Sequence, residues 1–220
     1  MDDEQSTAGH AQFVWPTPWN HNLHYHRVIL DAVPPGCERA LDVGCGAGAL
    51  TRALRRLAPQ VTGIDRDARS IELARGHPEA GNIEYLLADF LAATVDPGSL
   101  DLVTSVASLH HLDAEAALRR MSDLLRPGGT VAIVGLARGI SPVDLALSIP
   151  AVIGDRAHRV GSARDRPSAR RRPASYQPPI IWPPPVTYQE MRRLAARLLP
   201  GARYSRHLYW RYSLVWTKPR

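Results

Sequence analysis

The stretch Asp-Val-Gly-Cys-Gly-Ala-Gly-Ala-Leu-Thr, residues 42–51, decides the fold of this chain. It follows a short buried strand predicted over 40–43 and leads into a helix predicted over 50–57. Glycines have no Cβ, so they allow a sharp turn and let a ligand lie against bare main chain; the loop has Gly44, Gly46 and Gly48. We therefore predict a ligand site outside the carboxyl end of this strand, where ligands bind in parallel α/β folds.

The spacing of the loop does not by itself name the ligand. Gly44 and Gly46 are followed by Ala49, which also fits the loose dinucleotide pattern. Asp42 argues against a nicotinamide cofactor, because it would place a carboxylate beside a pyrophosphate that is already negative. No residues for hydride transfer are apparent. A cationic ligand with an amino group would tolerate Asp42 far better.

Outward from the loop, the sequence alternates between apolar runs of strand length and amphipathic helical stretches. This alternation predicts an α/β fold with a parallel sheet covered by helices on both faces. We expect a turn at 126–129, where Arg-Pro-Gly-Gly stands. The predicted strands are 40–43, 61–65, 83–88, 100–106 and 130–136, and the predicted helices are 50–57, 68–74 and 114–125.

The two ends of the chain extend this core. Residues 1–35 are predicted to form an N-terminal segment with a lid helix over 20–33, and residues 36–220 the main domain. Within that domain, 141–186 is predicted to be a helical and loop insertion after the fifth strand that covers the substrate site. A helix over 187–199 and two antiparallel strands, 202–207 and 209–217, complete the domain. Trp210, Tyr212 and Trp216 are predicted to share one face of the last strand.

Acidic residues end three successive strands. Asp42 ends the first, Asp65 the second and Asp89 the third, where Phe90 follows. A carboxylate at such a place accepts the hydroxyls of a ribose or the amino group of an adenine, and an aromatic ring packs on the base. The alternative is that the three acids cap the following helices. Their order along the sheet favours a nucleoside-containing ligand.

The composition limits the class of protein. Apolar residues make up 45% of 220, which is typical of a globular chain, and no apolar run reaches the length of a membrane span. The net charge is +6, but seven arginines and two aspartates within 155–172 supply +5 of it, so a broad surface for nucleic acid is not predicted. The chain has two cysteines, Cys37 and Cys45, and begins with a polar, acidic segment. We expect a cytoplasmic protein.

Five segments together resemble class I S-adenosylmethionine-dependent methyltransferases, in their order and spacing. The resemblance implies a Rossmann-like sheet of seven strands, mostly parallel, with the last strand antiparallel. It implies S-adenosylmethionine as cofactor and S-adenosylhomocysteine as product. The segments are Leu-Asp-Val-Gly-Cys-Gly-Ala-Gly (41–48), Val-Thr-Gly-Ile-Asp (61–65), Leu-Leu-Ala-Asp-Phe (86–90), Asp-Leu-Val-Thr-Ser-Val-Ala-Ser-Leu-His-His-Leu (101–112) and Leu-Leu-Arg-Pro-Gly-Gly-Thr (124–130).

The resemblance also assigns roles to residues on the cofactor side. Gly44–Gly48, which includes Cys45 and Gly46, would surround the methionine part, and the Val106 carbonyl would accept its amino group. Asp65 would bind the ribose, while Asp89 and Phe90 would lie at the adenine. Asp42 before the loop and Arg66 beside Asp65 complete the predicted cofactor-binding set.

On the substrate side the sequence offers fewer signals. His110 and His111 follow the fourth strand at the rim, and either imidazole would serve as a base near neutral pH; the alternative is a structural turn. Residues 21–26 do not predict a metal site, because a helix would direct His26 away from the other two histidines. The predicted substrate-cavity residues are Trp19, His21, His24, Tyr25 and Trp182.

Three functions are compatible with these patterns. The preferred one is methylation of a small molecule, at oxygen or nitrogen, of the kind found in secondary metabolism, by a monomer or homodimer. The second is methylation of RNA or protein with help from the arginine-rich segment 155–172. The third is a non-catalytic cofactor-binding protein on the same fold. The acceptor atom stays open, because no motif after the fourth strand names it.

Overall fold

The computed structural model describes residues 25–139, 182–208 and 210–220. Several predicted features lie outside these residues: Trp19, His21, His24, the first part of the lid helix, the arginine-rich segment 155–172 and the insertion up to residue 181.

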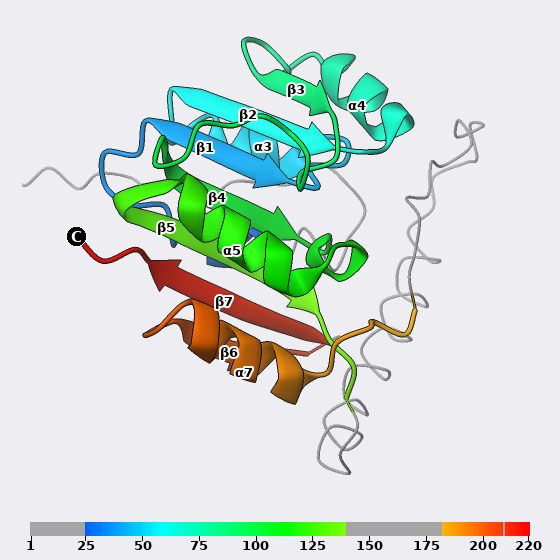
Figure 1. Cartoon of the computed structure of the whole chain (residues 1–220). Helices are drawn as coiled ribbons and strands as arrows, with labels where there is room; N and C mark the ends of the chain where they lie inside the picture. The colour runs from blue at the N-terminus through cyan, green and yellow to red at the C-terminus, as the bar shows by residue number, and fades with distance from the viewer. Residues whose placement is uncertain (1–24, 140–181, 209) are drawn as a thin grey trace, which may run out of the picture.

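Seven strands form one sheet in the order β3-β2-β1-β4-β5-β7-β6. The first five pair in parallel, and β7 runs antiparallel to both of its neighbours, β5 and β6. Figure 1 shows this, since the arrowhead of β7 points opposite to those of β4 and β5. The predicted mostly parallel sheet with an antiparallel last strand is confirmed. The strands are β1 Arg39–Val43, β2 Gln60–Asp65, β3 Glu84–Leu87, β4 Leu100–Val106, β5 Leu125–Leu136, β6 Arg203–Arg206 and β7 Arg211–Thr217.

Two details of the last strands differ from the prediction. Residues 126–129 are not a separate turn but belong to β5, because Gly128 and Gly129 exchange backbone hydrogen bonds with Lys218. This part of the strand is irregular, since Gly128 has a φ of 84° and the pairing with β4 shifts register here. Strand β7 begins at Arg211, and Trp210 precedes it with a φ of 57°. Trp210 therefore does not lie on the strand with Tyr212 and Trp216.

Helices cover both faces of the sheet. Residues of α5 and α7 pack with Leu41, Ile64 and Val103 in one apolar cluster, and Figure 1 shows these two helices on the same face. Residues of α2 and α3 pack with Leu102 and Ala132 in a second cluster on the other face. None of the described helices is long and apolar enough to cross a bilayer. The helices are α2 His26–Leu30, α3 Ala49–Leu54, α4 Ala68–Arg75, α5 Ala114–Leu124 and α7 Tyr188–Leu198, with a 3₁₀ turn η1 Leu109–His111.

Side-chain caps fix where three of these helices begin. The Asp67 carboxylate accepts from the Ser70 N–H at the start of α4, and Asp113 does the same at α5. Thr187 and Glu190 form a capping box at α7. The two aspartates that cap helices, Asp67 and Asp113, are not among the three acids at the strand ends, Asp42, Asp65 and Asp89.

The contact between β5 and β7 requires a glycine at position 135. Gly135 pairs directly with Tyr212, whose ring is fully buried against it. A Cβ at Gly135 would overlap the ring carbons and the hydroxyl of Tyr212. The antiparallel addition of β7 to the sheet therefore depends on this close approach.

We expect Gly135→Ala to destabilise the protein by about 1–3 kcal/mol, because the Tyr212 ring must leave its place in a close-packed core. Urea unfolding followed by circular dichroism measures the change. Gly76→Ala is the matched control, since its added Cβ would meet only the backbone oxygens of Glu72 at 3.3 Å and Leu73 at 4.0 Å. The double variant Gly135→Ala/Tyr212→Leu should lose less stability than the summed losses of the two single variants. Equal stability of Gly135→Ala and wild type would contradict this account of the sheet.

Candidate active site

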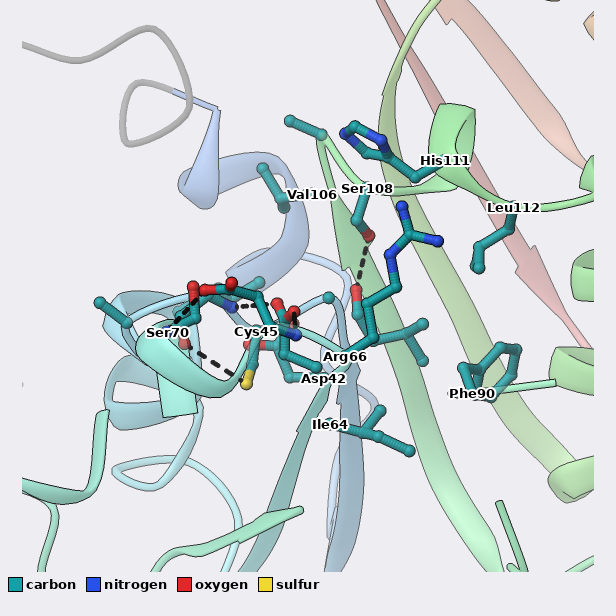
Figure 2. A pocket seen from close by; sticks show the side chains of 18 of the residues that line it. Asp42, Cys45, Ile64, Arg66, Ser70, Phe90, Val106, Ser108, His111 and Leu112 are labelled. Atoms are coloured by element: carbon teal, nitrogen blue, oxygen red, sulfur yellow. Dashed lines mark hydrogen bonds between the residues drawn. The ribbon is translucent and has the colours of Figure 1, made fainter. Parts of the chain in front are cut away.

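A cavity of about 380 Å³ lies at the carboxyl ends of the parallel strands. The segments that follow β1, β2, β3 and β4 form it, and α2 and η1 contribute one wall (Figure 2). Its volume falls within the range of small-molecule sites. The described lining residues with polar or aromatic side chains are His26, Asp42, Cys45, Asp65, Arg66, Asp67, Ser70, Asp89, Phe90, Ser108 and His111.

Glycine is required at each of the three positions in the loop for a different structural reason. A Cβ at Gly44 would overlap Ser108, and a Cβ at Gly48 would overlap the buried ring of Tyr85. A Cβ at Gly46 would meet nothing within 4 Å, and its φ is 54°. Gly44 and Gly46 line the cavity, and Gly48 is not among the lining residues. Gly46 therefore leaves open space for a ligand, while the other two allow the loop to pack.

Asp42 is almost completely buried beneath the loop. Its carboxylate accepts hydrogen bonds from the hydroxyl of Thr51 at 2.7 Å and of Thr104 at 3.1 Å. Burial raises the pKa of this carboxyl to about 6, and the two hydroxyls oppose the rise. Asp42 also lines the cavity. It connects α3 and β4 to β1 and adds negative charge beneath the loop.

Asp65 connects the glycine loop to the end of β2. One carboxylate oxygen accepts from the Gly46 N–H at 2.8 Å and the other from the Asp67 N–H at 2.9 Å. Asp89 is exposed and accepts from the Leu91 N–H at 2.8 Å. Both acids line the cavity. Each retains lone pairs for a ligand, because a carboxylate has about four acceptor sites.

The remaining predicted cofactor residues also line the cavity. Phe90 is buried, and the Arg120 guanidinium lies 5.4 Å from its ring centroid. The Cys45 thiol donates to the Gly46 carbonyl at 3.6 Å, and burial raises its pKa. Val106 ends β4, and Arg66 extends into the cavity (Figure 2). Of the ten predicted cofactor residues, all except Gly48 therefore meet at one place.

The two histidines after β4 are placed differently. His111 lines the cavity, whereas His110 is not among the lining residues, and their ring centroids are 4.1 Å apart. Burial lowers the pKa of His110 to about 4, with contributions from His111 and Arg211. Burial also lowers the pKa of His111, followed by the charge of Arg66. Both imidazoles are therefore neutral at pH 7, the form that accepts a proton.

Sequence reasoning did not place His26 and Ser108 in the site. His26, the first residue of α2, is buried and lines the cavity, and burial lowers its pKa to about 4. The Ser108 hydroxyl donates to the Val43 carbonyl at 2.7 Å and shares a 2.6 Å hydrogen bond with Ser105. The histidine run at 21–26 pointed to this region, but His26 was not among the residues predicted to line the cavity. No pattern indicated Ser108.

Two predicted substrate residues lie elsewhere in the described chain. The Tyr25 side chain is buried, and its hydroxyl donates to the Leu208 carbonyl at 3.0 Å. Trp182 is 56% exposed and packs edge-on against Trp210. Neither lines the cavity. Among the described residues there is no group of three or more side chains that could hold a metal ion.

The cavity fits the cofactor that the resemblance implies. Open space beside Gly46 accommodates a ligand against main chain, and four carboxylates suit a ligand that carries an amino group and a positive centre. Asp65 and Asp89 lie at successive strand ends, where hydroxyls and a base amino group would find acceptors.

Comparison with known proteins gives the same family. Residues 41–133 match the family described as "Methyltransferase domain". An uncharacterized methyltransferase of Mycobacterium tuberculosis is 36% identical over 203 residues, which cover 92% of this chain and 98% of the relative. A ubiquinone biosynthesis O-methyltransferase of Xanthomonas campestris is 38% identical over 122 residues, which cover 52% of this chain and 48% of that enzyme.

Solved structures agree on the fold. The N-methyltransferase NodS of Bradyrhizobium japonicum is similar with a TM-score of 0.59 and 15% identity, over 90% of this chain and 96% of that one. A phosphoethanolamine N-methyltransferase of Haemonchus contortus gives a TM-score of 0.56 and 18% identity, over 83% of this chain and 38% of that one. Because the mycobacterial relative matches nearly the whole chain at 36% identity, the protein belongs to the class I S-adenosylmethionine-dependent methyltransferase family.

Proposed function

We propose that this protein methylates an oxygen or nitrogen atom of a small molecule, with S-adenosylmethionine as the methyl donor. One observation carries the proposal: the glycine loop, the carboxylates and the His111 imidazole all line the same cavity. A cofactor held by the first two would therefore share one space with an acceptor at the third. The names of two similar proteins, an O-methyltransferase and an N-methyltransferase, support these two acceptor atoms.

Different residues would bind different parts of the cofactor. S-adenosylmethionine supplies a methyl group on a sulfonium, and the acceptor's lone pair forms the new bond while the old bonding pair stays on sulfur. Asp65 and Asp89 would hold the nucleoside part, and the main chain at Gly44–Gly48 the methionine part. Alignment of the reactants supplies much of the rate of such a displacement. The walls of the cavity therefore matter more than any single reactive side chain.

His111 is the base that we propose. It lies on the η1 turn and lines the cavity, and its Nδ1 is buried without a hydrogen-bond partner among the described residues. Its lowered pKa keeps it neutral and able to take a proton from a hydroxyl or an ammonium group. His110, which does not line the cavity, would support the turn.

Binding of the cofactor is the first test. We expect micromolar affinity for S-adenosylhomocysteine by calorimetry, and Asp65→Ala should weaken it at least about tenfold, or about 1.4 kcal/mol. The loss combines missing ligand contacts with the loss of the acceptor for the Gly46 N–H. Asp123→Ala is the control, because Asp123 is an exposed carboxylate that does not line the cavity. Absence of any binding heat for the wild type would exclude the proposed function.

The protonation of the two histidines gives a second test. Burial disfavours the charged form, so we expect both imidazoles to titrate below the ordinary value of 6.5, His110 at about 4. Side-chain NMR titration from neutral to acid pH measures this, with His110→Gln and His111→Gln to assign the signals. An imidazole at position 111 that is mainly protonated at pH 7 would contradict its role as a base.

Methyl transfer is the direct test. Protein and methyl-labelled cofactor are incubated with a panel of phenols, carboxylic acids and amines, and label in the organic product is counted. We expect transfer to part of the panel, lowered roughly 10²–10⁴-fold in kcat by His111→Gln. The acid limb of the pH profile, below pH 6.5, should also vanish in this variant. Tight cofactor binding with no transfer to any acceptor would favour a non-catalytic role instead.

A further inference from the structure

The charged side chains of the cavity are distributed unevenly. The side formed after β1, β2 and β3 carries every carboxylate of the described lining: Asp42, Asp65, Asp67 and Asp89. The side formed by α2, β4 and η1 contributes no carboxylate to that lining; it contributes the imidazoles of His26 and His111 and the hydroxyl of Ser108. The acceptor side is therefore the less acidic half of the site.

Arg66 brings a positive charge to this half. It is the one arginine or lysine in the described lining, and it follows Asp65 at the end of β2. Its side chain does not turn back to the carboxylates beside it. Figure 2 shows its guanidinium extending across the cavity toward Ser108, Leu112 and His111. Arg66 thus starts from the cofactor side and ends on the acceptor side.

The neighbouring carboxylates do not hold Arg66 in an ion pair. Both oxygens of Asp65 accept backbone N–H groups, and Asp67 accepts from Ser70. No ion pair or hydrogen bond joins the Arg66 guanidinium to any residue within 25–139, 182–208 or 210–220. Its five donors are therefore available to a ligand.

We propose that Arg66 is the anion-binding residue for the methyl acceptor, and that the acceptor presents an acidic oxygen, as in a phenol or a carboxylic acid, to the guanidinium beside His111. This inference rests on the proposed function and narrows its acceptor class. For a phenol it assigns two complementary roles: His111 takes the proton, and Arg66 binds the oxygen anion that remains. A carboxylic acid is already ionised at pH 7 and would need only Arg66.

Three physical points support this pairing. A guanidinium stays charged at every relevant pH and binds oxyanions through paired, charge-assisted hydrogen bonds. A protonated amine in the same place would be repelled by Arg66. The charge of Arg66 also reaches His111, since it is the second cause, after burial, of the lowered pKa of that imidazole, while Asp65 opposes it. The two groups therefore act on the same small region.

Binding of simple probes to the protein saturated with S-adenosylhomocysteine tests the proposal. Calorimetry with para-nitrophenol, benzoate and benzylamine compares a phenol, a carboxylate and a cation of similar size. We expect one or both anions to bind and benzylamine not to. Arg66→Met should weaken the anion about tenfold, and Arg66→Lys less, because a charged hydrogen bond is lost in the first variant and only its forked geometry in the second.

Arg69→Met is the matched control. Arg69 lies on α4, three residues along the chain, pairs with Glu72 and does not line the cavity. We expect it to bind each probe as wild type does. Preference for para-nitrophenol over benzoate would identify the acceptor as a phenol, and the reverse preference as a carboxylic acid. Either result supports the anion-binding role.

A second readout needs no acceptor. Removal of the Arg66 charge should raise the pKa of His111 in the NMR titration, because a nearby positive charge disfavours the imidazolium. Arg69→Met should leave it unchanged. An unchanged value in a folded Arg66→Met variant would mean that the guanidinium does not lie beside His111, and it would count against the proposal.

Several outcomes would overturn the inference. They are benzylamine binding as tightly as the anions, binding of none of the three probes, and anion binding that Arg66→Met leaves intact. These results are distinguishable from a failure of the proposed function. In that case the wild-type protein would not bind S-adenosylhomocysteine at all. Transfer of label to amines but not to phenols or acids would keep the proposed function and remove this acceptor class.

Discussion

A buried carboxylate under the glycine loop is the constraint on which the site depends. Asp42 accepts the hydroxyls of Thr51 on α3 and Thr104 on β4, so one side chain joins three elements. Loss of either hydroxyl would leave a buried charge with fewer partners, which costs more than an ordinary hydrogen bond provides. This requirement holds the start of α3 and the end of β4 in register with β1.

The turn after β4 packs directly against the glycine loop. Ser108 packs where a side chain on Gly44 would be, and its hydroxyl donates to the Val43 carbonyl. Ala107, just before it, adopts a φ of 53°, a conformation that non-glycine residues rarely take. The turn that carries His111 is thus fastened directly to the loop, and the two halves of the cavity keep a fixed relation.

Features that depend on neighbouring residues in the sequence were predicted correctly, and features that depend on distant contacts were not. The succession of strands and helices and the meeting of Asp42, Asp65 and Asp89 follow from local periodicity and from the rule that parallel strands end at one edge. The antiparallel last strand followed from the resemblance to the family, and the strand order was not predicted. The prediction of a separate turn at 126–129 was wrong, because Lys218, which lies far along the chain, pairs with this segment and makes it part of β5. Gly48 looked like a ligand contact, yet it makes room for Tyr85.

The sequence by itself determined the fold and the family, and it predicted most of the residues that meet at the cavity, because glycines and strand-ending acids are local features that act where the chain places them. Only the tertiary structure decided which of two adjacent histidines lines the cavity, that His26 joins it, and where the Arg66 guanidinium points. Those properties depend on side-chain direction and on packing between elements distant in the chain. A one-residue change in helical register, or a long flexible side chain, is enough to alter them.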